Sequence, residues 1–123
     1  PADADASLAG YRAPVPLCAD EACHTAADLA RVAGKYACIN IKLDKTGGLT
    51  AALDLAREAQ NLGLSIMVGC MVSTSLSMAP PFMLSSFAHF VDLDGPLLLS
   101  HDRKPGLRYD GTRMFAPPAA LWG

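Results

Sequence analysis

Ionisable side chains lie inside or directly after apolar runs at three places in the chain. The residues concerned are Asp20, Glu21, Lys42, Asp92 and Asp94. An ionisable group among apolar residues loses its hydration, and it recovers that cost only through a charge partner, a metal or a substrate. Asp92 and Asp94 flank Leu93 in an extended run, so their carboxylates should face one side and repel unless a cation lies between them. The pattern therefore predicts a site for a metal, a substrate or both.

Four short apolar runs, rich in valine and isoleucine, have the character of buried strands. They cover residues 15–19, 39–43, 66–69 and 90–93. Stretches with helical character lie between them, at residues 26–33, 49–62 and 78–87. One helix between each pair of consecutive strands predicts an α/β fold in which parallel strands alternate with helices.

The length of the chain leaves two architectures open. A complete (β/α)8 barrel runs to about 250 residues, whereas this chain has 123 residues. Four strand-and-helix units would suit either half of a barrel or a small open sheet. In both architectures ligands bind at the carboxyl ends of the strands, which is where the charged residues above are expected to lie.

The composition excludes several classes of partner. Ten Lys and Arg residues oppose twelve Asp and Glu residues without a basic run, so neither nucleic acid nor an anionic membrane is an expected partner. The uncharged stretch 59–91 contains polar residues and a Pro-Pro pair, which favour a buried core over a membrane span. Four cysteines without metal-site spacing predict reduced thiols in a cytoplasmic protein.

An ordered set of motifs resembles the enolase superfamily, and within it the dipeptide epimerases of the L-Ala-D/L-Glu type. The set consists of Asp20-Glu21, INIKLDKTGGL at 39–49, MVGCM at 67–71 and DLDGP at 92–96. The resemblance implies a TIM-like (β/α)7β barrel beneath a capping domain, with this chain as the C-terminal half of the barrel. Residues 1–108 would then supply about strands 5 to 8, and residues 109–123 would return toward the capping domain.

The same resemblance implies a role for each candidate site residue. Asp20 would be a fifth-strand ligand of Mg²⁺, and Lys42 would be the sixth-strand acid/base that epimerises a dipeptide by 1,1-proton transfer through an enediolate. Asp92 and Asp94 would bind the free ammonium group of the dipeptide, while Cys70 and Met71 would line the substrate pocket. The second acid/base, the other metal ligands, the first half of the barrel and the capping domain are not in the chain.

Two further expectations follow from the missing parts. In the family a metal ligand commonly precedes a proline in a Glu-Gln-Pro run, and Pro1 would be that proline. We therefore expect a truncated chain that is inactive alone, from an enzyme that forms a homo-oligomer when full length.

Other functions and plainer structural roles remain open. An N-acylamino acid racemase, an o-succinylbenzoate synthase or a muconate cycloisomerase would share the metal and lysine but lack the Asp-x-Asp pair. A non-catalytic half-barrel that self-associates through its open edges is a further alternative. Asp20 could cap a helix, Lys42 could be a snorkelling lysine, and Lys45 should form an ion pair with Asp44 or an acid at the sheet edge.

Overall fold

Four parallel strands form one sheet and follow one another in chain order. They are β1 (Cys18–Ala19), β2 (Cys38–Ile41), β3 (Ser65–Val68) and β4 (Phe90–Val91). The computed structural model describes residues 2–123, so the expectation for Pro1 lies outside the described residues. In the register of the sheet, Ile39 lies between Ala19 and Ile66. The predicted α/β fold with a parallel sheet is confirmed.

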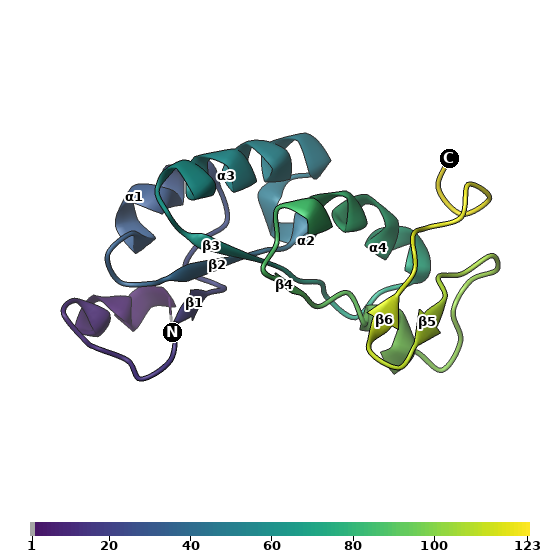
Figure 1. Cartoon of the computed structure of the whole chain (residues 1–123), viewed down its shortest axis with the longest axis horizontal. Coiled ribbons are helices and arrows are strands. Elements are labelled where there is room, and N and C mark those ends of the chain that lie inside the picture. The colour runs from purple at the N-terminus through teal and green to yellow at the C-terminus, as the bar shows by residue number, and fades with distance from the viewer. Residues whose placement is uncertain (1) are drawn as a thin grey trace.

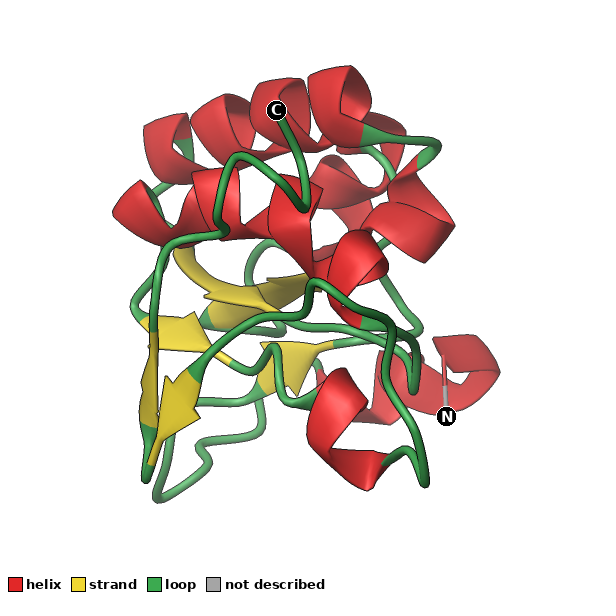
Figure 2. Cartoon of the chain, turned by 90° about the vertical axis from the view of Figure 1, so that its right-hand side faces the viewer, coloured by secondary structure: helices red, strands yellow, loops and turns green. Residues whose placement is uncertain are grey.

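Helices fill each interval between strands, and short elements surround them. These are η1 (Ala2–Leu8), η2 (Ala26–Asp28), α1 (Leu29–Val32), α2 (Leu43–Thr46), α3 (Leu49–Asn61), α4 (Ser75–Phe82), η3 (Met83–Ser86), η4 (Gly95–Leu98) and the hairpin of β5 (Tyr109–Asp110) and β6 (Arg113–Met114). Helices α1, α3 and α4 all lie on one side of the sheet (Figures 1 and 2). The other face of the sheet is therefore free to carry polar side chains.

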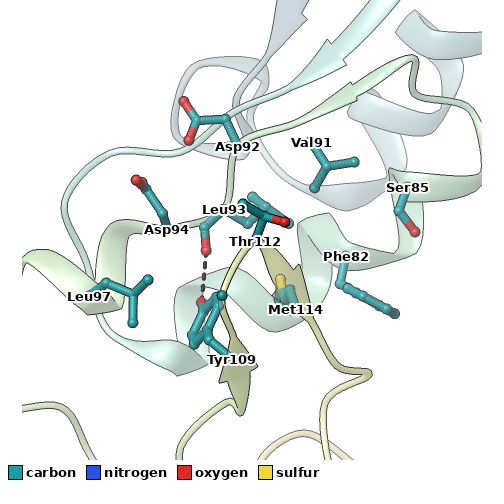
Figure 3. A pocket seen from close by; sticks show the side chains of 11 residues that line it. Phe82, Ser85, Val91, Asp92, Leu93, Asp94, Leu97, Tyr109, Thr112 and Met114 are labelled. Atoms are coloured by element: carbon teal, nitrogen blue, oxygen red, sulfur yellow. Dashed lines mark hydrogen bonds between the residues drawn. The ribbon is translucent and has the colours of Figure 1, made fainter.

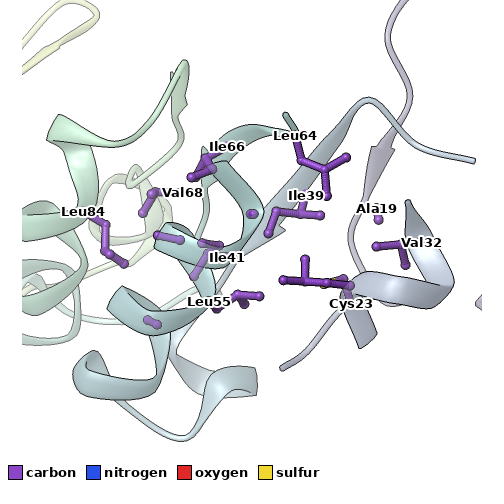
Figure 4. Packing of buried hydrophobic residues seen from close by; sticks show 14 of the residues in the cluster. Ala19, Cys23, Val32, Ile39, Ile41, Leu55, Leu64, Ile66, Val68 and Leu84 are labelled. Atoms are coloured by element: carbon purple, nitrogen blue, oxygen red, sulfur yellow. The ribbon is translucent and has the colours of Figure 1, made fainter. Parts of the chain in front are cut away.

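Alternate residues of the strands build the core between the sheet and the helices. Ile39 and Ile41 of β2 and Ile66 and Val68 of β3 are fully buried. They pack in one apolar cluster with Leu55 of α3 (Figure 4). Because side chains alternate along a strand, this arrangement turns Asn40 and Lys42 toward the opposite face.

The strand boundaries differ from the prediction at both edges of the sheet. The first strand begins at Cys18 instead of residue 15, since Val15 is 64% exposed and lies between two prolines, which cannot donate to a ladder. The last strand ends at Val91, and Asp94 already has helical backbone angles as the cap of η4. Asp92 and Asp94 therefore follow the fourth strand and do not lie within it.

Helix α4 begins at Ser75, three residues before the predicted start, and includes Pro80 and Pro81. The carboxylate of Asp102 accepts the Ser75 N–H at 3.0 Å across 27 residues of sequence. This contact gives a partner to a backbone N–H that has none within the helix. No pattern in the neighbouring sequence predicted it. Along residues 2–123, none of the helices combines the length and the apolar character that a membrane crossing requires.

Gly47 and Gly48 form the tight turn between α2 and α3. Their φ angles are 86° and 116°, in the region that favours glycine. Only these two residues separate α2 from α3, and the turn lets α3 pack back over the sheet.

Candidate functional site

The carboxyl edge of the sheet brings Asp20 and Lys42 together. Asp20 follows β1 directly and Lys42 follows β2, and these two strands are paired. The Lys42 ammonium donates to Asp20 Oδ2 at 3.1 Å, and the Lys42 side chain is only 13% exposed. Lys42 is thus held by an acid on the neighbouring strand and does not extend into solvent.

Lys45 binds the same acid from the other side. Its ammonium contacts Asp20 Oδ1 and also lies 3.1 Å from Glu21 Oε1. The expected ion pair between Lys45 and an acid at the sheet edge is confirmed. Burial opposes ionisation of Asp20, but hydrogen bonds from Lys45 and Lys42 outweigh it and hold the pKa of Asp20 below its ordinary value. His24 lies 3.6 Å from Glu21, at the exposed rim of the cluster.

Met71 and Cys70 follow β3 and face different surroundings. The Met71 sulfur is 4.0 Å from the Lys42 ammonium, and the residue is 52% exposed. The Cys70 thiol is half-buried against the core and accepts the Gly95 N–H. Burial raises the pKa of the Cys70 thiol, although the Gly95 hydrogen bond opposes the rise. Met71 therefore borders the Lys42 site directly, whereas Cys70 contacts the segment that carries the paired aspartates.

Asp92 and Asp94 present their carboxylates on one side of the chain beyond β4. Both residues are exposed, while Leu93 between them is 3% exposed and belongs to the core (Figure 3). Burial, followed by the neighbouring charge of Asp94, raises the pKa of Asp92, and the Lys42 charge opposes the rise. The pair is a like-charge site that an added cation would relieve.

A cavity of about 470 Å³ adjoins this pair. Asp92, Leu93 and Asp94 line one part of it, and Tyr109 and Met114 of the β5–β6 hairpin line another (Figure 3). The cavity has the volume of a small-molecule pocket. The hairpin thus comes back to the segment that holds the aspartates.

Asn40 lies deeper on the same face of β2 as Lys42. It is 6% exposed, and its side-chain oxygen has no hydrogen-bond partner within residues 2–123. Gly69 provides the room for it, because a Cβ at position 69 would lie 2.5 Å from that oxygen. Sequence reasoning did not single out this pair, since an asparagine in a strand carries no functional signal of its own.

We predict that Gly69→Ala destabilises the protein by about 1–3 kcal/mol, the usual cost of overpacking a filled interior. Chemical unfolding measures the effect. The double variant with Asn40→Ala should recover part of the loss, because the colliding side chain is then gone. Gly123→Ala is the matched control, as its methyl group would meet nothing within 4 Å. Equal stability of Gly69→Ala and the parent would contradict the close approach.

At this edge of the sheet, Asp20 has the chemistry of one ligand of a hard cation. Asp20 offers carboxylate oxygens, which Mg²⁺ prefers. Within the part of the chain that the structure describes, however, no three His, Cys, Asp or Glu side chains form a group that could hold an ion. Asp20 could therefore contribute to a metal site, but the described residues do not complete one.

Comparison with known proteins identifies a family and its members. The family model described as enolase C-terminal domain-like matches residues 1–119. An N-acetyl-D-glutamate racemase from a Pseudoalteromonas species is 53% identical over all 123 residues, which is 39% of that relative. The L-Ala-D/L-Glu epimerase of Escherichia coli K12 is 49% identical over 109 residues, covering 89% of this chain and 34% of the relative.

Two solved structures show the same fold with ligands. An enolase family member from Agrobacterium tumefaciens, with bound sodium and L-Ala-L-Glu, matches with a TM-score of 0.97 and 54% identity over 100% of this chain and 38% of its own. A dipeptide epimerase from Methylococcus capsulatus, complexed with Mg and L-Arg-D-Lys, matches with a TM-score of 0.85 and 28% identity over 95% and 36%. The chain therefore spans between 34% and 39% of the length of these four proteins.

Proposed function

The chain belongs to the enolase C-terminal domain-like family, and we propose that it supplies part of the active site of a Mg²⁺-dependent dipeptide epimerase of the L-Ala-D/L-Glu type. Its relatives are racemases and epimerases of amino acid derivatives. The observation that carries the proposal is the pair of carboxylates at Asp92 and Asp94, which follow β4 at the same carboxyl edge of the parallel sheet at which Lys42 follows β2.

Lys42, which follows β2, would be the acid/base. In this proposal its amine exchanges a proton with the carbon next to the substrate carboxylate, from one face of that carbon. A bound Mg²⁺ would stabilise the negative charge that develops on that carboxylate. Asp20 would hold the metal from this chain while its hydrogen bond keeps Lys42 at the edge of the sheet. The group that serves the opposite face comes from outside residues 2–123.

The Asp92 and Asp94 carboxylates would bind the free ammonium group of a dipeptide. An ammonium between them removes their mutual repulsion and gains charge-assisted hydrogen bonds. A substrate with a neutral acylated nitrogen gains neither. The pair therefore favours a dipeptide over an N-acylamino acid, an o-succinylbenzoate precursor or a muconate.

A second candidate is racemisation of N-acetylglutamate, because the relative that matches the whole chain at 53% identity carries that name. The two candidate substrates are closely matched. L-Ala-L-Glu and N-acetyl-L-glutamate both present an acylated glutamate. They differ at the carbon next to the acyl carbonyl, which carries an ammonium group and a methyl group in the dipeptide and only hydrogens in the acetyl compound. The aspartate pair is expected to sense the ammonium group.

The test is to measure α-proton exchange in D₂O with both substrates, using the full-length gene product that contains this chain and added Mg²⁺. We expect kcat/KM to favour L-Ala-L-Glu by roughly ten- to a hundredfold, the value of a charge-assisted hydrogen bond. Preferential turnover of N-acetyl-L-glutamate would replace the proposal with the second candidate. Turnover of neither substrate would reject both.

Further expectations stay predictions. They concern the homo-oligomeric state, the cytoplasmic location and the alternative of a non-catalytic, self-associating half-barrel. The exposed edge strand β4, with Phe90 59% and Val91 47% exposed, is the surface through which such a module would associate.

A further inference from the structure

The segment that carries the paired aspartates is irregular, yet backbone contacts hold it at three points. The Asp92 N–H donates to the Val68 carbonyl at 2.8 Å. The Tyr109 hydroxyl donates to the Leu93 carbonyl at 2.8 Å (Figure 3). The Gly95 N–H donates to the Cys70 thiol. These contacts restrain the segment although it has no regular secondary structure.

Close packing reinforces the contact at Gly95. A Cβ there would lie 2.7 Å from the Met71 carbonyl and 3.3 Å from the Cys70 sulfur. The chain beyond β4 is therefore pressed against the chain beyond β3, which fixes one end of the aspartate segment. The other end continues the β3–β4 ladder through Asp92.

Among these three contacts, the one from Tyr109 is that in which a side-chain hydroxyl donates to the backbone of the segment. It acts at Leu93, midway between the two aspartates and 16 residues away. Its own position is well defined, because β5 pairs with β6 and the Arg108 guanidinium lies 3.1 Å from the centre of the Phe115 ring. Met114 of the same hairpin packs on the core.

Two carboxylates of like charge tend to move apart. Leu93 lies between them, and its side chain is anchored in the core. A hydrogen bond from Tyr109 to the Leu93 carbonyl further restrains the backbone between the two aspartates and keeps both carboxylates on the side that faces the site.

We propose that Tyr109 is a positioning residue that fixes the Leu93 carbonyl and so sets the spacing of Asp92 and Asp94 for an ammonium group. This inference rests on the proposed function and deepens it, since it assigns a specificity role to a residue outside the motif. Tyr109 itself touches neither the acid/base nor the reacting carbon.

The test is Tyr109→Phe in the full-length gene product, which removes one oxygen and keeps the ring. We expect KM for L-Ala-L-Glu to rise about three- to tenfold, the effect of one lost hydrogen bond. The kcat of the variant for the dipeptide should change less than twofold. The kcat and KM for N-acetyl-L-glutamate should not change. Tyr11→Phe, at a tyrosine that is 60% exposed, is the matched control and should have no effect.

Restoring a hydrogen-bond donor at position 109 distinguishes a positioning role from a purely structural one. Incorporating 4-aminophenylalanine at position 109 restores a donor of similar reach, and it should bring KM for the dipeptide back toward the parent value. Thermal unfolding verifies that each variant is folded. Should Tyr109→Phe not fold, 4-fluorophenylalanine provides a ring with a similar substituent but no proton to donate.

The outcomes separate the two proposals. If the parent protein turns over the dipeptide and Tyr109→Phe leaves KM unchanged, the role of Tyr109 is overturned and the proposed function stands. If both substrates lose activity equally in the variant, Tyr109 is a general structural residue and the inference is also wrong. If the parent protein does not turn over the dipeptide, the proposed function fails and the ammonium role of Tyr109 fails with it.

Discussion

Replacing Lys42 with methionine is expected to lower the rate of α-proton exchange by about 10²- to 10⁴-fold, the contribution of a positioned acid/base. Methionine matches the lysine side chain as far as Cε and lacks the proton-carrying amine. In the proposed reaction Lys42 serves one face of the substrate carbon, so the loss should fall on one of the two epimers. The other epimer should still exchange its proton through the group on the opposite face. Exchange of each epimer in D₂O, followed by ¹H NMR, measures the two rates separately.

The control for this experiment is Lys104→Met, at an exposed lysine. It should leave both exchange rates unchanged. Lys42→Met also leaves the Asp20 carboxylate with Lys45 as its partner, so the cluster retains a compensating charge. A folded Lys42→Met variant that exchanges both epimers at the parent rate would remove Lys42 from the reaction.

Neutralising the paired aspartates is expected to reverse substrate preference. In the double variant Asp92→Asn with Asp94→Asn, kcat/KM for L-Ala-L-Glu should fall about a hundredfold or more, since an ammonium would lose both charged partners. N-acetyl-L-glutamate carries no ammonium, so its constant should stay within about threefold of the parent value. Steady-state kinetics with the two substrates gives the comparison.

The pH dependence of the parent protein offers an independent view of the same pair. The pKa of Asp92 is raised, so its charge is lost at a higher pH than for an ordinary aspartate. Preference for the dipeptide should therefore weaken as the pH falls through that raised pKa and be fully present above it. Asp54→Asn, on the surface of α3 beside Arg57, is the control for a simple change in net charge.

Loss of activity toward both substrates in the aspartate variant would contradict a role in ammonium recognition. An unchanged kcat/KM for L-Ala-L-Glu in this variant would also contradict that role. The first result would indicate that the segment supports the site as a whole, and the second that the ammonium is bound elsewhere.

Local patterns in the sequence were sufficient to predict the layered architecture. Hydrophobic runs at strand length alternated with helical stretches, and this alternation leaves few topologies other than a parallel sheet. The carboxyl ends of parallel strands share one edge, so the sequence pattern predicts that Asp20 and Lys42 lie close together. Their 3.1 Å contact follows from that rule.

The limits of the elements were harder to predict, because distant contacts decide them. Helix α4 begins at Ser75 since Asp102, far along the chain, accepts its N–H. The last strand is short since Asp94 turns into η4 instead of extending the ladder. Hydrophobic periodicity reports which face of an element is buried, but it does not report what caps its ends.

Sequence patterns were therefore enough to predict the order of strands and helices and to predict which ionisable residues reach the carboxyl edge of the sheet. How those residues are held depends on contacts between distant segments: Lys45 shares Asp20 with Lys42, Asn40 fills the space left by Gly69, and Tyr109 binds the carbonyl between the two aspartates. The physical reason is that strand and helix patterns arise from neighbours in sequence. A hydrogen bond or an ion pair depends on the direction of two side chains whose positions are set by the packing of the whole sheet.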